Sequence, residues 1–169
     1  MALYKNNAFI ADSWRHIADG EGVPSAGHVI FSLEWWKAER GAFDGSNVPL
    51  GLRLEPGAKI EEIAGDIARF ALIELPFPKF GDGRAFSIAL MLRERYGFKG
   101  ELRAVGEVLI DQIQPMMRCG FDAFDITDAV TESALRSGRI PGVTHFYQPG
   151  RSLETPVGTR PWTRQVSSA

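Results

Sequence analysis

The sequence has little of several features that would define its class. Among 169 residues there is a single cysteine, which excludes a disulfide framework within the chain, a zinc site of paired cysteines and an all-cysteine iron–sulfur cluster. Its uninterrupted apolar runs are far shorter than the roughly 20 residues that cross a bilayer. We therefore expect no membrane segment and a cytoplasmic location, where a lone thiol stays reduced.

A large excess of charge of one sign is missing as well. The chain has 19 Lys and Arg against 21 Asp and Glu, for a formal net charge of −2. Such a chain lacks the positive field that nucleic-acid binding normally needs, so we expect no nucleic-acid partner. The glycine fingerprints of nucleotide-binding loops are absent, and the three histidines lack the spacing of a metal site. We assign no metal, and the cofactor stays unknown.

The remaining composition is that of an ordinary globular domain. Hydrophobic residues make up 44% and charged residues 24% of the chain, and the length fits one domain. We expect a single α/β domain over residues 1–150. Its first 27 residues are read as a β-ribbon appendage with a turn at 11–13, followed by a connector, and residues 151–169 as an extended proline-rich tail.

Strand-like and helix-like segments alternate along the chain. Strands are expected at 28–31, 48–54, 70–75, 101–105 and 121–126, and helices at 33–40, 60–67, 84–96, 108–119 and 129–137. This alternation is typical of parallel strands joined by right-handed helical crossovers. We predict a parallel sheet of about five strands. A partial (β/α) barrel is the alternative, because a complete barrel needs about 250 residues.

Loops that leave the carboxyl ends of parallel strands form the ligand crevice of such folds. The loop at 76–84 is stiffened by two prolines and precedes a helix whose first N–H groups are free. These features indicate a site for a phosphate, sulfate or carboxylate, for which the candidate residues are Lys79, Asp82, Gly83, Arg84 and Ser87. The simpler alternative is that Asp82 only caps the helix and that both cations are solvated.

A second loop adds a cation and two carboxylates. Arg103 lies inside an expected strand, where a guanidinium must be paired because burial of a lone charge is costly. It either forms a structural ion pair, with Glu101, Glu107 or Asp111 as partner, or reaches the crevice and shares the anion. Glu107 and Asp111 are four residues apart and are candidate catalytic carboxylates for proton transfer, although such pairs often form a solvated helix face.

Four sequence blocks within residues 77–126 carry a resemblance to a known family: FPKFGDGR, LRERYG, GELRAVGEVLIDQ and RCGFDAF. With them the chain resembles a bacterial family of unknown function whose members are described as oxidoreductases involved in sulfite reduction. Residues 28–75 match more loosely, and Glu107 stands where the family pattern has Asp. The resemblance implies cytoplasmic sulfur assimilation beside sulfite or sulfate reduction enzymes. It supplies no catalytic residues, and no residue pattern here supports a redox cofactor.

Three functions follow as hypotheses. The first is an accessory protein of assimilatory sulfite or sulfate reduction that binds an oxyanion or an anionic metabolite at the carboxyl ends of the strands. The second is a lyase, isomerase or reductase in which Glu107 or Asp111 is the base and Arg103 anchors the anion. The third is a protein–protein adaptor of the sulfite reduction machinery that uses Trp35, Trp36 and the proline-rich tail. A homodimer is expected, with one of the two tryptophans at the contact.

Overall fold

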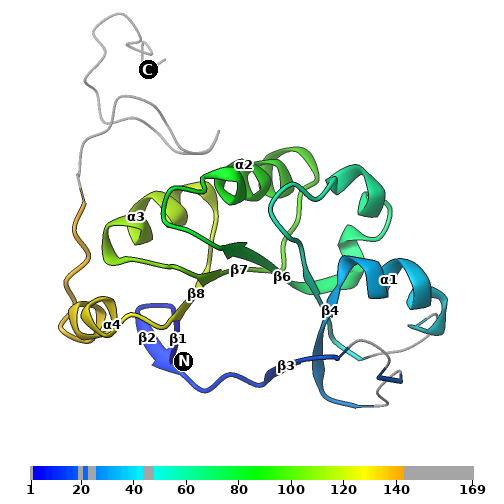
Figure 1. Cartoon of the computed structure of the whole chain (residues 1–169), viewed down its shortest axis with the longest axis horizontal. Helices are drawn as coiled ribbons and strands as arrows, with labels where there is room; N and C mark the ends of the chain where they lie inside the picture. The colour runs from blue at the N-terminus through cyan, green and yellow to red at the C-terminus, as the bar shows by residue number, and fades with distance from the viewer. Residues whose placement is uncertain (1, 19–20, 23–25, 44–47, 143–169) are drawn as a thin grey trace, which may run out of the picture.

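The computed structural model describes residues 2–18, 21–22, 26–43 and 48–142 (Figure 1). One eight-stranded sheet has the order β2-β1-β8-β7-β6-β5-β4-β3. Its strands are β1 (Ala2–Lys5), β2 (Ala8–Ile10), β3 (Trp14–His16), β4 (His28–Ser32), β5 (Leu50–Arg53), β6 (Phe70–Phe77), β7 (Glu101–Gly106) and β8 (Ala123–Ile126). Strands β3 to β8 are parallel to one another, whereas β1 is antiparallel to both β2 and β8.

In the part of the chain that the structure describes, four α-helices connect or follow these strands. They are α1 (Leu33–Glu39), α2 (Arg84–Leu90), α3 (Ile110–Cys119) and α4 (Ala129–Arg136), with a π-helical turn, Met91–Arg95, directly after α2. The expected start of α1 is confirmed, because Ser32 Oγ accepts a hydrogen bond from the backbone N–H of Trp35 at 3.1 Å. Among the described residues, no helix has the length and apolarity needed to cross a membrane.

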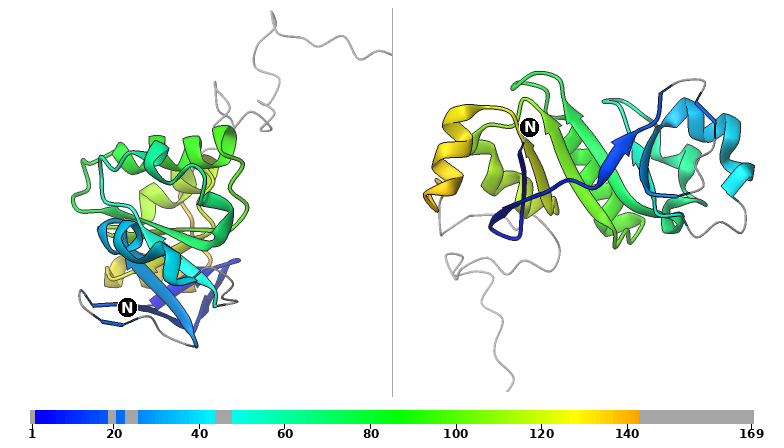
Figure 2. Two further views of the ribbon diagram at one scale, coloured as in Figure 1. Left: turned by 90° about the vertical axis from the view of Figure 1, so that its right-hand side faces the viewer. Right: turned by 90° about the horizontal axis from the view of Figure 1, so that it is seen from below.

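The sheet curls into a half-barrel, and the link between β2 and β3 shows why it must. These two strands form opposite edges of the sheet, yet only residues 11–13 join them. In a flat sheet, seven strand spacings would separate them by about 34 Å. The chain from Ile10 to Trp14 reaches about 14 Å at most. The edges must therefore approach each other, and the link crosses the hollow of the sheet (Figures 1 and 2).

The two faces of the sheet differ in chemistry. Alternate residues of the central strands, such as Leu52, Ile73, Leu75, Leu102 and Phe124, belong to an apolar core that also contains residues of α1, α2 and α3. The helices cover this outer face in Figure 1. The residues that alternate with them along the strands point to the hollow of the half-barrel. This concave face of the sheet is called the inner face below.

The α/β class and the mostly parallel strands are confirmed, but the sheet has eight strands instead of about five. The N-terminal ribbon is formed by β1 and β2, with its turn at Asn6 and Asn7 instead of at residues 11–13. Both asparagines have positive φ, 52° and 61°, as two-residue hairpin turns require. The predicted turn is the link across the hollow, and β3 pairs with β4 at the far edge. The proline-rich tail expected at 151–169 lies outside the described residues.

The helix expected at 60–67 is also different. The segment forms two 3₁₀ turns, η2 (Ile60–Ile63) and η3 (Ile67–Arg69), with hydrogen bonds between residues three apart. Ile60, Ile63 and Ile67 are buried as the pattern predicts, while Ala64 is exposed. An apolar spacing of three fits a 3₁₀ turn as well as an α-helix, so the pattern does not distinguish the two.

Candidate functional site

The loops that follow β6 and β7 meet at the carboxyl ends of these strands. This region, residues 78–84 and 106–112, is called the rim below. Glu107 Oε2 accepts a hydrogen bond from the backbone N–H of Phe80 at 2.7 Å, and the backbone N–H of Glu107 donates to the Phe77 carbonyl at 2.8 Å. Gln112 Nε2 donates to the Phe80 carbonyl at 3.3 Å. Two successive β–α units are thus joined by side chains of the second one.

This close approach depends on Gly106. Its φ is +90°, in the left-handed region that glycine tolerates. A Cβ at this position would lie 2.5 Å from the Phe77 carbonyl oxygen. A side chain here would therefore push the two loops apart.

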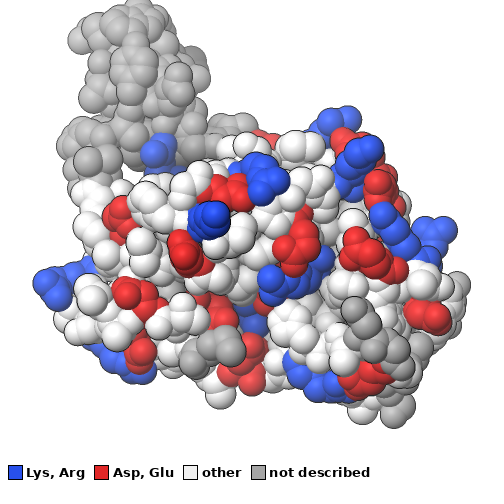
Figure 3. All heavy atoms as spheres, in the orientation of Figure 1, with Lys and Arg blue, Asp and Glu red and all other residues white. Residues whose placement is uncertain are grey.

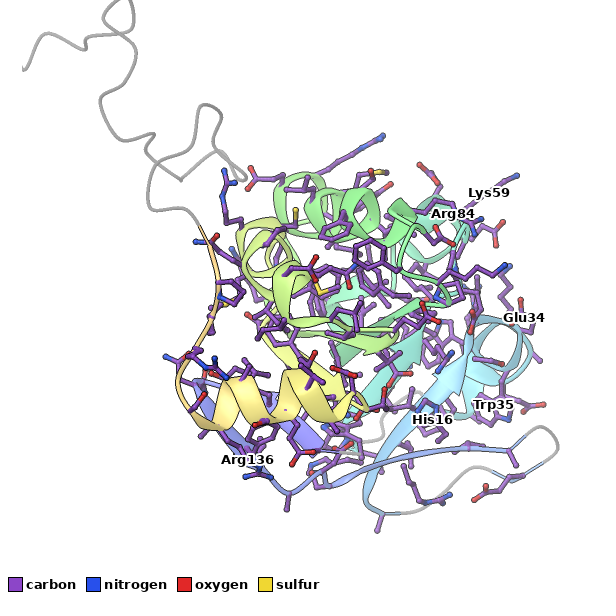
Figure 4. All side chains as sticks on the ribbon, turned by 60° about the vertical axis from the view of Figure 1, so that its left-hand side comes forward. His16, Glu34, Trp35, Lys59, Arg84 and Arg136 are labelled. Carbon is purple, nitrogen blue, oxygen red and sulfur yellow. The ribbon has the colours of Figure 1, made fainter. Side chains whose placement is uncertain are left out.

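Arg84 connects the rim to a third loop. Its Nε and Nη2 donate to the two oxygens of Asp82 at 2.9 and 2.6 Å, and its Nη1 donates to the Pro56 carbonyl at 3.2 Å. Arg84 holds the pKa of the Asp82 carboxyl well below its usual range, at about 2, mainly through these hydrogen bonds. Figure 4 shows Lys59, from the same third loop, at the same corner of the molecule as Arg84.

The other predicted rim residues lie at the surface. Lys79 is exposed, and its carbonyl accepts the backbone N–H of Asp82 at 2.9 Å, which closes a turn. Gly83 is the residue before α2, and exposed Ser87 lies three residues after Arg84 on the same face of that helix. Asp111 is exposed in the first turn of α3. Within the described part of the chain, no hydrogen bond joins Asp111 to Glu107.

The structure does not bring Arg103 to the rim. Its side chain lies on the inner face and is only 3% exposed. Arg103 Nη1 lies 2.7 Å from Asp12 Oδ2, and its Nε lies 2.9 Å from Glu101 Oε1. Arg103 is thus held in a structural ion pair, as one of the two interpretations predicted, and Glu101 is among the partners considered.

Strand register builds a row of charges around Arg103. Arg53, Glu74 and Arg103 lie opposite one another on β5, β6 and β7, so cation, anion and cation alternate across the sheet. Glu74 is 3% exposed, and its Oε2 lies 3.2 Å from Arg53 Nη1 and 3.4 Å from His16 Nε2. Burial of these charges is tolerated because each one has a partner.

The inner face also contains a carboxyl group with a shifted pKa. Burial raises the pKa of Asp125 above its ordinary value of 3.8, and the nearby carboxylates of Glu74 and Asp12 act in the same direction. The cation of Arg103 opposes this shift. The inner face therefore favours the neutral form of one carboxyl group, while the rim favours the ionised form of Asp82.

Sequence reasoning missed most of the inner face. Asp12 and Arg103 are 91 residues apart, so no local pattern links them. One local signal in β6 did point to this face: Glu74 is a charged residue that interrupts the apolar run FALIEL. Phe80 was missed too, although it lies in the most informative loop.

Two other expectations concern partners and ions. Trp35 and Trp36 are 9% and 1% exposed and pack with Phe31 and Phe43, so the expectation that one of them marks a contact surface is wrong. No group of three metal-ligating side chains occurs among the described residues. Figure 3 shows cationic and anionic side chains intermixed on the face in view, without a patch of one sign.

A comparison with known protein families finds a match over much of the chain. The family described as "Bacterial protein of unknown function (DUF934)" matches residues 51–158, which is more than half of the chain. The protein therefore belongs to this family. The matched region contains the whole rim and the charges of β5 to β8, but not Asp12 or His16. No curated protein matches the chain.

Proposed function

We propose that this DUF934 member binds a small oxyanion, or a metabolite that carries one, at the rim. Lys79 and Arg84 supply the positive charge, Ser87 adds a hydroxyl group, and Asp82 and Gly83 shape the turn between the cations. The observation that supports this most is the anchored loop, because the bonds of Glu107 and Gln112 to Phe80 hold the backbone next to Lys79 at the surface. A loop whose backbone is already fixed binds an anion with less loss of conformational entropy than a mobile loop.

Arg84 keeps binding capacity despite its partners. A guanidinium has five N–H donors, and the bonds to Asp82 and Pro56 use three of them. Its side chain is 60% exposed, so the remaining donors are accessible. Among the described residues Lys79 forms no ion pair, and its ammonium group is available to a ligand. Arg103 is left out of this site because Asp12 and Glu101 occupy it on the inner face.

We further propose that the protein serves assimilatory sulfite or sulfate reduction as an accessory protein. This part of the proposal rests on the resemblance of the four sequence blocks, and the geometry contributes only the oxyanion chemistry. An enzymatic role as a lyase, isomerase or reductase is less favoured. Glu107, one proposed base, already holds the loop through Phe80, and Asp111 is exposed at the surface.

Calorimetric titration with sulfite, sulfate and phosphate tests the binding function. We expect at least one of these anions to bind, and we expect Lys79→Ala to weaken its binding about tenfold. The matched control is Lys99→Ala, because Lys99 is also exposed but precedes β7 at the opposite end of the sheet. Binding that is absent for all three anions, or weakened equally by both substitutions, would refute the rim as the oxyanion site.

A further inference from the structure

Phe80 is an exposed aromatic residue in a loop that is otherwise anchored. The exposed large apolar side chains of the described residues are Ile10, Phe80, Met117 and Val130. Phe80 is the aromatic one among them, and it is 51% exposed. It also lies in the rim, between Lys79 and the turn that leads to Arg84. The ring therefore belongs to the same loop as the cations of the proposed anion site.

Both polar groups of the Phe80 backbone are fixed by side chains. Its N–H donates to Glu107, and its carbonyl accepts from Gln112, a polar residue that is 8% exposed. Gln112 is itself held, because its Oε1 accepts the backbone N–H of Leu109 at 3.2 Å. The main chain at Phe80 cannot turn to bury the ring without breaking these bonds. The backbone that carries the exposed ring is therefore fixed on both sides of the peptide unit.

The loop that carries this ring also carries two cations, Lys79 and Arg84. Lys79 is its neighbour in sequence. The Lys79 carbonyl accepts the backbone N–H of Asp82, and the Asp82 carboxylate pairs with Arg84, so one turn carries the ring and both cations. Arg84 in turn holds the Pro56 carbonyl, three residues before exposed Lys59. An aromatic face and positive charges together fit a ligand that has a planar ring and an anionic group, because ring stacking and charge attraction then act on the same molecule.

We propose that the rim binds an anion that carries a planar ring, of the nucleotide type, with the ring stacked on Phe80 and the anionic group held by Lys79 and Arg84. This inference rests on the proposed function, since it names the ligand class of the same site. A simple inorganic oxyanion would use the cations alone and would leave Phe80 without a role in binding.

Three probes separate the ring from the charge: adenosine 5′-phosphate, inorganic phosphate and adenosine, each titrated calorimetrically against the full chain. We expect adenosine 5′-phosphate to bind at least tenfold more tightly than phosphate, and adenosine to bind more weakly than adenosine 5′-phosphate. If phosphate and adenosine 5′-phosphate bind equally, the stacking inference is wrong while the anion site stands. If no anion binds, including sulfite and sulfate, the proposed function itself fails.

The substitution Phe80→Leu tests the ring directly, because leucine keeps an apolar side chain on the same backbone bonds. We expect it to reduce adenosine 5′-phosphate affinity at least fivefold and to leave phosphate affinity unchanged. Val130→Ala, at an exposed apolar position on α4, is the matched control and should change neither affinity. A preference for adenosine 5′-phosphate that survives Phe80→Leu overturns the inference.

Discussion

The inner face and the rim each contain an arginine paired with an aspartate, but in different surroundings. The side chain of Arg103 is 3% exposed and that of Arg84 is 60% exposed. Arg103 contacts residues of β7 and of the link across the hollow, so its bonds join distant parts of the sheet. Arg84 contacts its own loop and the Pro56 carbonyl.

This difference separates what holds the fold from what is free to bind. On the inner face, every cation of the row is matched by a buried or half-buried carboxylate, and Glu101 is shared by Arg103 and Lys5. Each of these charges is therefore needed to compensate the burial of its partner. At the rim, Arg84 keeps two unused donors, and Lys79 has no ion pair among the described residues. We infer that the inner face stabilises the half-barrel and that the rim is the surface where a ligand binds.

The largest expected effect is that of Arg103→Met on stability. The substitution leaves Asp12 and Glu101 without their guanidinium partner, and the loss of one member of a buried pair costs about 3–5 kcal/mol. We expect the free energy of unfolding in urea to fall by about 3 kcal/mol, since Lys5 still pairs with Glu101 at 2.6 Å.

The matched substitution at the rim is Arg84→Met. An exposed ion pair contributes little to stability, so this change should lower the free energy of unfolding far less than Arg103→Met does. Equal losses of stability for the two variants would contradict the distinction between a structural inner face and an exposed rim.

A smaller effect concerns the dependence of stability on pH. The pKa of Asp125 is raised above 3.8 in the folded state, so its contribution favours folding at low pH and is lost as pH rises through the folded pKa. The pKa of Asp82 is lowered to about 2, so its contribution is present above pH 3.8 and is lost as pH falls toward 2. The two carboxyl groups therefore act in opposite directions.

Neutral variants measure these contributions by chemical denaturation across pH. We expect Asp125→Asn to be more stable than the unmodified chain at pH 7, with the difference disappearing below about pH 4. Asp82→Asn should be less stable at pH 7 and should approach the unmodified chain near pH 2. A loss of stability at pH 7 in Asp125→Asn would show that this carboxylate is stabilised by its neighbours, contrary to the account.

The sequence was informative where a structural element depends on nearby residues. The strands at 28–31 and 101–105, the Ser32 cap and the helices after them follow from apolar spacing and capping, which act within a few residues. The meeting of the loops after β6 and β7 was also predictable, because parallel strands place their carboxyl ends at one edge.

The features that sequence reasoning missed depend on closure of the sheet. Residues 11–13 were predicted to form a turn because the segment is short and contains polar residues. Its role is to join two edges that only the curled sheet brings together. Asp12 and Arg103 become partners for the same reason. The place of Phe80 depends on the hydrogen bonds that the side chains of Glu107 and Gln112 form with its backbone. No residue spacing within the loop reveals these bonds.

The most direct test of the division between rim and inner face is to follow the backbone amide resonances during titration with adenosine 5′-phosphate. The account predicts that the amides of Lys79, Phe80 and Arg84 shift with the ligand, while those of Arg53, Glu74 and Arg103 stay in place. Shifts confined to the inner-face row, with the rim amides unchanged, would contradict it.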